Sequence, residues 1–214
     1  MIKDSLLYFD KIFLINLDSR PDRLEKVMIQ LRELGVEELI ERFSAIVPSN
    51  GDGRLGCMLS HLEIIKRAKS LNLKNILVLE DDVFFMNTES ISNSISQLSS
   101  REWTVYYLGY NSHSPLYLED SNLLNIKNCY STHAIAYNSS IFELIIDSFE
   151  RGEIKIIDVW LSKNIQNRFN CFGCYPIAAT QLNDYSDIEK TNVNYDFIVR
   201  RFLENTKHLG KKKR

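Results

Sequence analysis

The sequence predicts an α/β fold in a single domain, with a mainly parallel central sheet flanked by helices. Two short apolar runs, at residues 12–17 and 75–79, are typical of strands buried on both faces of a parallel sheet. Apolar residues at helical spacing lie between these runs, at 24–34 and 57–71. The alternation of strand and helix favours a three-layer arrangement, and 214 residues suffice for one domain with a sizeable core.

Local signals along the chain predict where the elements begin and end. Ser19 and Pro21 are typical of a helix start, and Gly35 predicts the end of that helix. Residues 117–128 are too polar and irregular to assign, and residues 181–188 are expected to form a loop. The other expected strands cover residues 42–46, 104–109, 133–137 and 171–175, and the other expected helices cover 139–149, part of 156–169 and 195–208.

The formal net charge of −2 hides an uneven charge distribution. Residues 195–214 contain seven basic and two acidic residues, so this segment carries +5 and the preceding residues carry −7. We therefore divide the chain into a body, residues 1–194, and a basic amphipathic tail, residues 195–214. The tail either contacts an anionic membrane surface or is a solvated chain end. Nucleic acid is disfavoured as a partner, because the acidic body would repel phosphates.

Targeting signals and cysteine usage give an expectation for the cellular compartment of the protein. No run of about 18 apolar residues predicts a membrane span, and the N-terminal residues do not resemble a secretory signal. We therefore expect a cytoplasmic location, with peripheral contact to the cytoplasmic face of a membrane as an alternative. Four cysteines are too few for a disulfide scaffold. Cys171 and Cys174 have the CxxC spacing, but one such pair is a weak zinc or redox signal, and we expect reduced thiols.

Three consecutive carboxylates, Glu80, Asp81 and Asp82, follow the second apolar run directly. The carboxyl ends of strands are where open α/β sheets bind their ligands. A divalent cation would compensate the mutual repulsion of these groups, and Mg²⁺ or Mn²⁺ commonly uses one or two carboxylates together with phosphate oxygens. The triplet therefore predicts a metal and phosphate site, with a solvated acidic turn as the alternative.

Five blocks of the sequence, in order, resemble glycosyltransferase family 25, which includes bacterial lipooligosaccharide galactosyltransferases and collagen galactosyltransferases. The blocks are IFLINLDSRPDR at 12–23, LGCMLSHL at 55–62, LVLEDDV at 77–83, THAIAY at 132–137, and YPIAATQ at 175–181 with Ser186, Asp187 and Ile188. Together they cover roughly residues 11–190. One such block alone is a weak signal, whereas five in order are specific.

This resemblance implies a GT-A type fold with residues 1–194 as the catalytic domain. It also implies transfer of a hexose with inversion from a UDP-sugar, usually UDP-galactose, with glucose or N-acetylhexosamine as other possibilities. The acceptor would be a glycan, a glycolipid or a hydroxylated protein, as in lipopolysaccharide or other glycan biosynthesis. Mn²⁺ or Mg²⁺ would stabilise the charge that develops on the departing diphosphate.

The resemblance also assigns residues to the donor site. Glu80 and Asp82 match the outer positions of an Asp-x-Asp-type motif and are expected nearest to the metal, while Asp81 is expected to face the ribose or a backbone amide. The other residues expected to contact the donor are Asn16, Arg20, Arg23, Gly56, Ser60, His61 and Gln181. The alternatives are solvated surface charge for the arginines and a structural hydrogen bond for His61. His133 is a weaker candidate of the same kind.

An inverting transfer needs a base that takes the proton of the acceptor hydroxyl. Asp158 is the first candidate, because it resembles the family's acidic position before the last sheet segment. An ordinary helix N-cap is the alternative for Asp158. Asp187 is the second candidate for the base, or completes the donor site with Gln181. Several aromatic residues either stack on sugars or pack in the core, and these are Trp103, Tyr106, Tyr107, Tyr110 and Trp160.

Two other function classes stay open on the sequence alone. One is a metal-dependent phosphohydrolase or nucleotidyl enzyme that uses the same acidic strand end. The haloacid dehalogenase pattern argues against it, because that pattern needs Asp-x-Asp-Gly-Thr and here Val83, Phe84 and Phe85 follow the acids. The other is an inactive sugar-nucleotide-binding module, which the intact acidic triplet disfavours.

Overall fold

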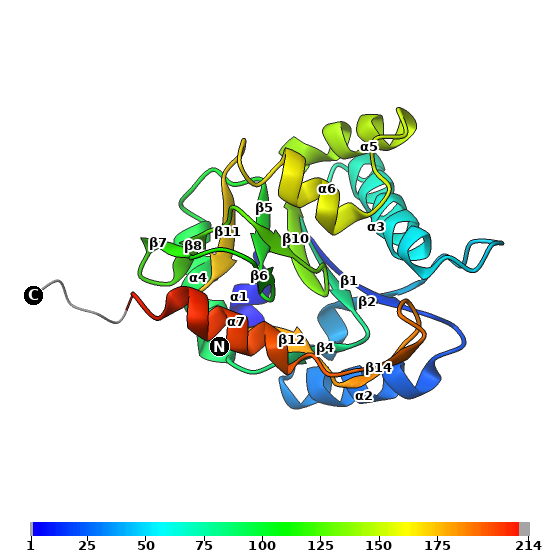
Figure 1. Cartoon of the computed structure of the whole chain (residues 1–214), viewed down its shortest axis with the longest axis horizontal. Coiled ribbons are helices and arrows are strands. Elements are labelled where there is room, and N and C mark those ends of the chain that lie inside the picture. The colour runs from blue at the N-terminus through cyan, green and yellow to red at the C-terminus, as the bar shows by residue number, and fades with distance from the viewer. Residues whose placement is uncertain (1, 210–214) are drawn as a thin grey trace, which may run out of the picture.

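A single eight-stranded sheet forms the centre of the computed structural model, which describes residues 2–209 (Figure 1). The strands lie in the order β2-β1-β3-β10-β5-β11-β8-β7. In that order their bounds are Ile40–Ser44, Lys11–Asn16, Asn75–Glu80, Ala134–Asn138, Val105–Tyr107, Cys171–Cys174, Leu123–Asn125 and Tyr117–Asp120. Six of the eight strands point the same way, and β10 and β8 oppose them. The predicted α/β class with a mainly parallel sheet is confirmed.

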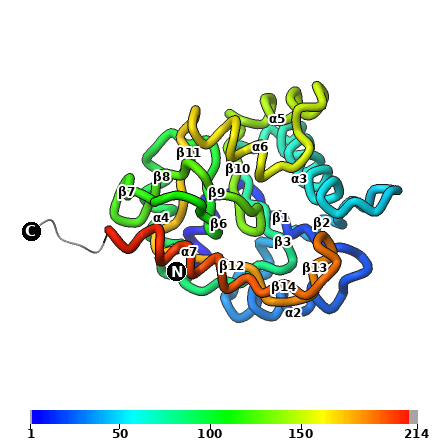
Figure 2. The backbone as a smooth tube through the Cα atoms, viewed as in Figure 1, coloured from blue at the N-terminus to red at the C-terminus, as the bar shows by residue number. Residues whose placement is uncertain are grey.

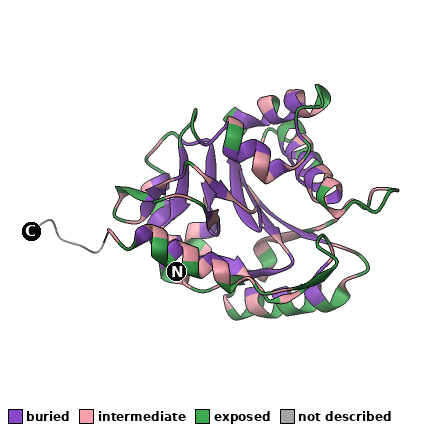
Figure 3. Cartoon of the chain, viewed as in Figure 1, coloured by how far each residue is buried: buried purple, intermediate pink, exposed green. Residues whose placement is uncertain are grey.

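Strand side chains alternate between two apolar layers, one on each face of the sheet. In β1, Phe13 and Ile15 face one layer, and Ile12 and Leu14 face the other. Helices α3, α5, α6 and α7 cover the first layer, and α1, α2 and α4 cover the second. The helices are α1 Ile2–Leu6, α2 Pro21–Glu33, α3 Gly53–Ser70, α4 Thr88–Leu98, α5 Phe142–Glu150, α6 Ile157–Asn164 and α7 Asp196–Thr206. Figure 3 shows that the buried residues concentrate in the sheet between these helices.

Short strand pairs and turns complete the fold around the main sheet. They are β4 Val83–Phe85 with β12 Ala179–Gln181, β13 Asp184–Ser186 with β14 Thr191–Val193, β6 Asn111–Ser112 with β9 Cys129–Tyr130, and the 3-10 turns η1 Glu37–Leu39 and η2 Ser139–Ile141. In the β4–β12 pair Gln181 lies opposite Val83, directly after the acidic triplet. The β13–β14 hairpin lies beside α2 (Figure 2), where Lys26 pairs with Asp184 at 3.1 Å. Both pairings bring the segment at residues 179–193 to the carboxyl edge of β3.

Four parts of the structure differ from the prediction, and the first is the expected loop at residues 181–188, which contains the last residue of β12 and the whole of β13. Helix α3 begins at Gly53 rather than Cys57, because the carboxylate of Asp52 caps it by accepting from the backbone N–H groups of Arg54 and Leu55. Strand β4 and helix α4 were not predicted, since α4 is mostly polar and buries only its apolar stripe. Residues 117–128, left unassigned from the sequence, contain β7 and β8.

The segment assigned to the basic tail begins with a helix that belongs to the domain core. In α7, Ile198 and Phe202 are buried against the first apolar layer. The backbone carbonyl of Asn205 accepts a hydrogen bond from Leu116, and its side-chain amide donates to Ser112. Residues 210–214, which carry four of the tail's basic residues, lie outside the described part of the chain. Among the helices of residues 2–209, none has the length and apolar character needed to cross a bilayer.

Candidate functional site

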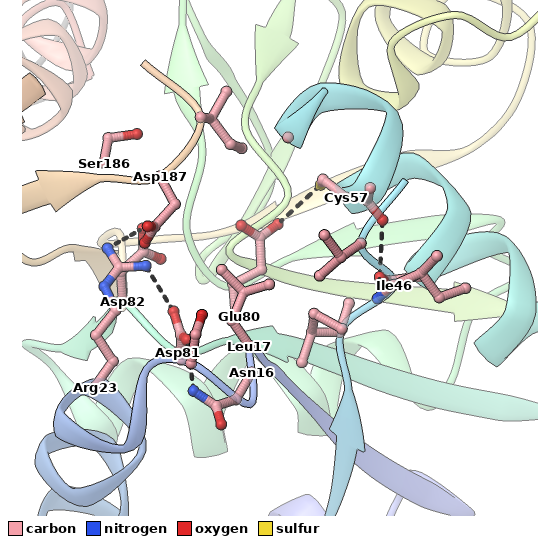
Figure 4. Close-up of a pocket in the computed structure, with 18 of the residues that line it drawn as sticks. Asn16, Leu17, Arg23, Ile46, Cys57, Glu80, Asp81, Asp82, Ser186 and Asp187 are labelled. Atoms are coloured by element: carbon pink, nitrogen blue, oxygen red, sulfur yellow. Dashed lines mark hydrogen bonds and ion pairs between the residues drawn. The ribbon is translucent and has the colours of Figure 1, made fainter. Parts of the chain in front are cut away.

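The carboxyl ends of β1 and β3 border a cavity of about 280 Å³, which the close-up in Figure 4 shows. The wall continues through the loop at residues 45–53, the start of α3 and the segment at residues 181–195. Most of the predicted site residues line this cavity, namely Asn16, Arg23, Gly56, Ser60, Glu80, Asp81, Asp82, Gln181 and Asp187. Arg20, His61 and Asp158 are outside this lining. The sheet edge predicted to bind a ligand is therefore hollow.

Two carboxylates of the acidic triplet turn toward α2 and pair with Arg23 (Figure 4). Arg23 Nη1 lies 2.7 Å from Asp81 Oδ1, and Arg23 Nη2 lies 3.4 Å from Asp82 Oδ2. Asn16 donates from Nδ2 to Asp81 Oδ2 at 2.8 Å, and Gln181 donates from Nε2 to Asp82 Oδ2 at 3.0 Å. Asn16 and Arg23 thus hold Asp81, and its contact with a ribose stays a prediction.

Glu80, the third carboxylate, points the other way, toward α3 and Cys57 (Figure 4). Its Oε1 atom accepts a hydrogen bond from Thr132 Oγ1 at 2.7 Å. The same oxygen lies 3.4 Å from His61 Nε2 and 3.9 Å from Cys57 Sγ. Glu80 is the last residue of β3, whereas Asp81 and Asp82 lie in the turn that follows, and their side chains point in a different direction. The acidic triplet therefore divides between two environments.

Burial sets the electrostatics of these carboxylates. Burial and the neighbouring charge of Glu80 raise the pKa of Asp82 to about 7. Burial also raises the pKa of Asp81, against the opposing effect of Arg23. Burial acts to raise the pKa of Glu80 as well, but the hydrogen bonds from His61 and Thr132 outweigh it and the pKa is lowered. A second cation beside Arg23 would relieve the remaining repulsion between the carboxylates of Glu80, Asp81 and Asp82.

Asp82 keeps one carboxylate oxygen for a further ligand. Its Oδ1 atom is buried and has no hydrogen-bond partner among residues 2–209. A buried oxygen of this kind is costly unless something binds it, and carboxylate oxygens are the ligands that Mg²⁺ and Mn²⁺ prefer. Asp82, with Glu80 as its neighbour, fits the divalent cation that the family resemblance implies.

Arg20 does not line the cavity, but its guanidinium pairs with Asp187, which does. Its guanidinium pairs with Asp22 at 2.9 Å and also with Asp187, and only Asp187 lines the cavity. Together with the Lys26–Asp184 pair, this contact fixes residues 184–188 against the start of α2. Direct contact of Arg20 with a nucleotide stays a prediction.

The start of α3 forms the opposite wall of the cavity. A Cβ atom on Gly56 would lie 2.6 Å from the carbonyl oxygen of Ile46, so glycine permits the close approach of α3 to this loop. Ser60 Oγ donates to the Gly56 carbonyl at 2.8 Å and accepts from the Ile46 N–H at 2.9 Å. His61 is fully buried, and its Nδ1 lies 3.1 Å from the Tyr137 hydroxyl. Gly56 and Ser60 line the wall and His61 does not, and the contacts of all three with a donor stay predictions.

Asp158 lies in a neighbouring cavity of about 200 Å³. Both cavities are lined by Cys57, Glu80, Gln181, Ser186, Ile188 and Tyr195. The N-cap interpretation of Asp158 is wrong, because Ile156 is the N-cap of α6 and Asp158 lies inside the helix. Its carboxylate accepts from the backbone N–H of Ser131 at 3.1 Å and of Val159 at 2.7 Å. The two cavities therefore meet at Glu80, with Asp158 on the far side.

Sequence reasoning missed three residues of this junction, Cys57, Thr132 and Tyr195. Two signals were available: Cys57 and Thr132 lie in blocks that resemble the family, and Cys57 and His61 are four residues apart and so share one face of α3. The aromatic residues considered for sugar stacking lie in the core instead, where Trp103, Tyr106, Tyr107, Tyr110 and Trp160 are all buried. His133 is also buried, and burial lowers its pKa to about 4 despite the opposing charge of Glu80.

Comparison with known families and proteins gives consistent matches. Residues 50–152, which include the acidic triplet, match the model of a family described as "Glycosyltransferase family 25 (LPS biosynthesis protein)". A "Glycosyltransferase 25 family member" of Drosophila pseudoobscura pseudoobscura is 33% identical over 105 residues, covering 37% of this chain and 16% of that protein. "Procollagen galactosyltransferase 1-B" of Xenopus laevis is 30% identical over 129 residues, covering 47% of this chain and 21% of that protein. The chain thus matches about a fifth of the length of these relatives.

One solved structure resembles the whole fold. A glycosyltransferase involved in glycosylation of the major capsid of PBCV-1 superposes with a TM-score of 0.52 at 12% sequence identity. The superposition covers 84% of this chain and 95% of that chain. At this identity the likeness concerns the fold alone, and it confirms the predicted fold class.

Proposed function

We propose that this chain, whose residues 50–152 match the model of glycosyltransferase family 25, transfers a hexose from a UDP-sugar to a hydroxyl group, with a divalent cation and inversion at the sugar. Galactose is the first donor sugar to test, followed by glucose and N-acetylhexosamine. A glycan, a glycolipid or a hydroxylated protein would be the acceptor. The observation that carries the proposal is the cavity of about 280 Å³ in which Asn16, Arg23 and the acidic triplet meet the start of α3.

The residues of the cavity suit the parts of a nucleotide sugar. Asp82 and Glu80 would hold Mn²⁺ or Mg²⁺, which supplies charge stabilisation for the diphosphate leaving group. Arg23 presents a guanidinium at the same place and can orient a phosphate oxygen. Asn16 and Asp81 offer polar groups at the end of β1 and β3 for the nucleoside. Gln181 orients Asp82 from the opposite side.

The neighbouring cavity suits the acceptor, with Asp158 as the base. Asp158 is separated from the donor side by Glu80 and Tyr195, which line both cavities. An inverting transfer needs its base on the side of the sugar opposite to the leaving group, and the position of Asp158 in the second cavity but not in the first supports this role. Asp187 is the second candidate, although its ion pair with Arg20 favours a role in holding the donor site.

We further propose that the basic tail brings the enzyme to an anionic membrane surface on the cytoplasmic side.

One observation favours a second candidate function, an inactive module that binds sugar nucleotides. Arg23 already neutralises part of the charge of Asp81 and Asp82, so these groups are stable in the fold without a metal. Such a module would bind UDP and show no turnover. The same experiment separates the two candidates.

The test is UDP binding and donor turnover by the purified chain. We expect UDP to bind more tightly with Mn²⁺ than without it, and one UDP-hexose to be hydrolysed slowly in preference to others, as measured by calorimetry and product mass. Asp82→Asn should abolish metal-dependent turnover and leave the circular dichroism spectrum unchanged. Asp120→Asn, at a surface ion pair with Arg101 on the edge strand β7, is the matched control and should keep turnover. If UDP fails to bind with and without Mn²⁺, both candidate functions are wrong.

A further inference from the structure

We propose that Cys57, His61 and Glu80 form a binding site for a thiophilic divalent cation, Zn²⁺ in the first instance. The Cys57 Sγ, His61 Nε2 and Glu80 Oε1 atoms all lie within 4.8 Å of one another. This cluster is separate from the free oxygen of Asp82, because Asp82 supplies none of its three ligand atoms. The inference does not depend on glycosyl transfer, because cation binding is measurable without donor or acceptor.

The fold places these three ligands together for simple geometric reasons. Cys57 and His61 are one helical turn apart in α3, so their side chains project from the same face. Glu80 is the last residue of β3, and Figure 4 shows its carboxylate pointing toward Cys57. The ligand atoms are 3.4 and 3.9 Å from Glu80 Oε1. Atoms bound to one Zn²⁺ at about 2.0–2.3 Å are separated by similar distances, so only a small adjustment is needed.

The ligand set selects for a particular class of cation. A thiolate, an imidazole and one carboxylate oxygen are typical ligands of Zn²⁺, whereas Mg²⁺ and Ca²⁺ prefer oxygen alone. Three protein ligands leave one tetrahedral position open, as in zinc sites that bind a water or a substrate. Cys57 and Glu80 line both cavities, so the open position faces the junction between them.

Two further residues orient the ligands. The Tyr137 hydroxyl lies 3.1 Å from His61 Nδ1, and in the cation-bound state it would accept the Nδ1 proton and leave Nε2 free to coordinate. The Thr132 hydroxyl donates to Glu80 Oε1 at 2.7 Å and fixes the carboxylate toward α3. Tyr137 and Thr132 are therefore positioning residues.

A cation at this position would draw Glu80 away from the cation proposed at Asp82. Zn²⁺ bound to Cys57 and His61 occupies Glu80 Oε1, while Mn²⁺ at the donor site would compete for the same side chain. The chain thus has two classes of cation site, and both use the carboxylate of Glu80. One site has thiolate and imidazole ligands besides this carboxylate, and the other is made of oxygen atoms alone.

The test is titration of the metal-free protein with Co²⁺ and then Zn²⁺, without nucleotide. Co²⁺ bound to a thiolate gives a charge-transfer absorption band in the near ultraviolet, which is a direct signature of Cys57. We expect about one Co²⁺ per chain with this band, and its loss when Zn²⁺ displaces the cobalt. Cys57→Ser should remove the band and weaken Zn²⁺ binding at least about tenfold, whereas Cys171→Ser, the matched loss of a thiol in β11, should change neither.

A second measurement uses the unmodified protein and covers the case in which a variant does not fold. Cys57 is partly exposed, whereas the other three cysteines are buried. Alkylation followed by peptide mass mapping should therefore label Cys57 first, and Zn²⁺ should protect it. Tyr137→Phe should weaken Zn²⁺ binding by about tenfold while keeping the cobalt band. The proposal is overturned if the wild type shows no cobalt–thiolate band, if the band persists in Cys57→Ser, or if Zn²⁺ leaves the alkylation rate unchanged.

Discussion

Arg23 is the residue that makes the acidic strand end compatible with a folded, metal-free protein. Its guanidinium pairs with Asp81 and Asp82, and all three side chains are at least nine-tenths buried. Burial of one charge alone would be costly, whereas a hydrogen-bonded cluster of opposite charges is tolerated. The sequence placed Arg23 near the donor, but no pattern in it indicates that α2 brings this arginine onto the triplet.

Arg23→Gln should destabilise the metal-free protein by about 3 kcal/mol, because it leaves two buried carboxylates without their cation. Mn²⁺ should then raise the melting temperature of the variant more than that of the wild type, since the metal replaces the lost charge. Urea unfolding and thermal scans with and without Mn²⁺ measure both effects.

Lys26→Gln is the matched control, because it also removes a cation of α2 but at an exposed pair with Asp184. Its free energy of unfolding should stay within about 1 kcal/mol of the wild type. Equal stability of Arg23→Gln and wild type in the absence of metal would contradict the role given to Arg23.

At the scale of the elements, buried strands were the most predictable part. β1, β3 and β10 have continuous apolar runs because both faces of the central sheet are covered, and their predicted positions are confirmed within about two residues. α4 was missed because its many serines hide the stripe formed by Ile91, Ile95 and Leu98. β7 was missed because it is an edge strand with exposed side chains, and β8 because it is only three residues long.

The sequence predicts which edge of the sheet holds the candidate site, but it does not predict which side chains contact one another there. Strand direction alone implies that Asn16 and Glu80 end at one edge of the sheet, and they line the same cavity. The partners of Glu80 depend on how β10 pairs with β3, which places Thr132 beside the acidic triplet. Such pairing between distant segments leaves no local pattern in the sequence.

Helix α7 changes how the proposed membrane contact has to be tested. Removal of residues 195–214 would strip Ile198 and Phe202 from the core and so destabilise the whole domain. Deletion of residues 210–214 alone removes four basic residues and no buried side chain of the described chain. Each basic residue near an anionic surface contributes roughly 1 kcal/mol, so this deletion should weaken binding to phosphatidylserine vesicles by up to about three orders of magnitude, as measured by co-sedimentation.

Neutral phosphatidylcholine vesicles are the control for this deletion, and they should bind both forms equally weakly. UDP binding should be the same with and without residues 210–214, which shows that the fold is intact. Equal co-sedimentation of the two forms with anionic vesicles would count against the tail as a membrane contact.

At the scale of the whole molecule, His133 should make the stability of the fold sensitive to acid. Its pKa is about 4 in the folded protein, because it is buried, against an ordinary value near 6.5. Between these two values the unfolded chain binds a proton that the folded chain does not. The free energy of unfolding should therefore fall as the pH is lowered from about 6.5 to about 4, by up to about 1.4 kcal/mol per pH unit from this group.

The measurement is urea unfolding of wild type and His133→Gln over this pH range. The variant should show a shallower decline, because its side chain does not titrate, while all other groups are common to both proteins. The comparison concerns the pH slope and is independent of any constant loss of stability in the variant. Identical slopes would mean that His133 is protonated in the folded state as readily as in the unfolded chain.

The place of β11 in the sheet has a consequence for how the protein is made. β8 contacts the rest of the main sheet only through β11, although β7 and β8 precede β11 by many residues in the chain. During synthesis the ribosome therefore releases the β7–β8 hairpin long before its partner strand exists, with the edge of β8 unpaired. Five strands, β2, β1, β3, β10 and β5, precede β11 in the chain and can pair with one another early, whereas β8 and β7 can join the sheet only after residues 171–174 have been made. A pause in translation before that point would leave an open strand edge in the crowded cell.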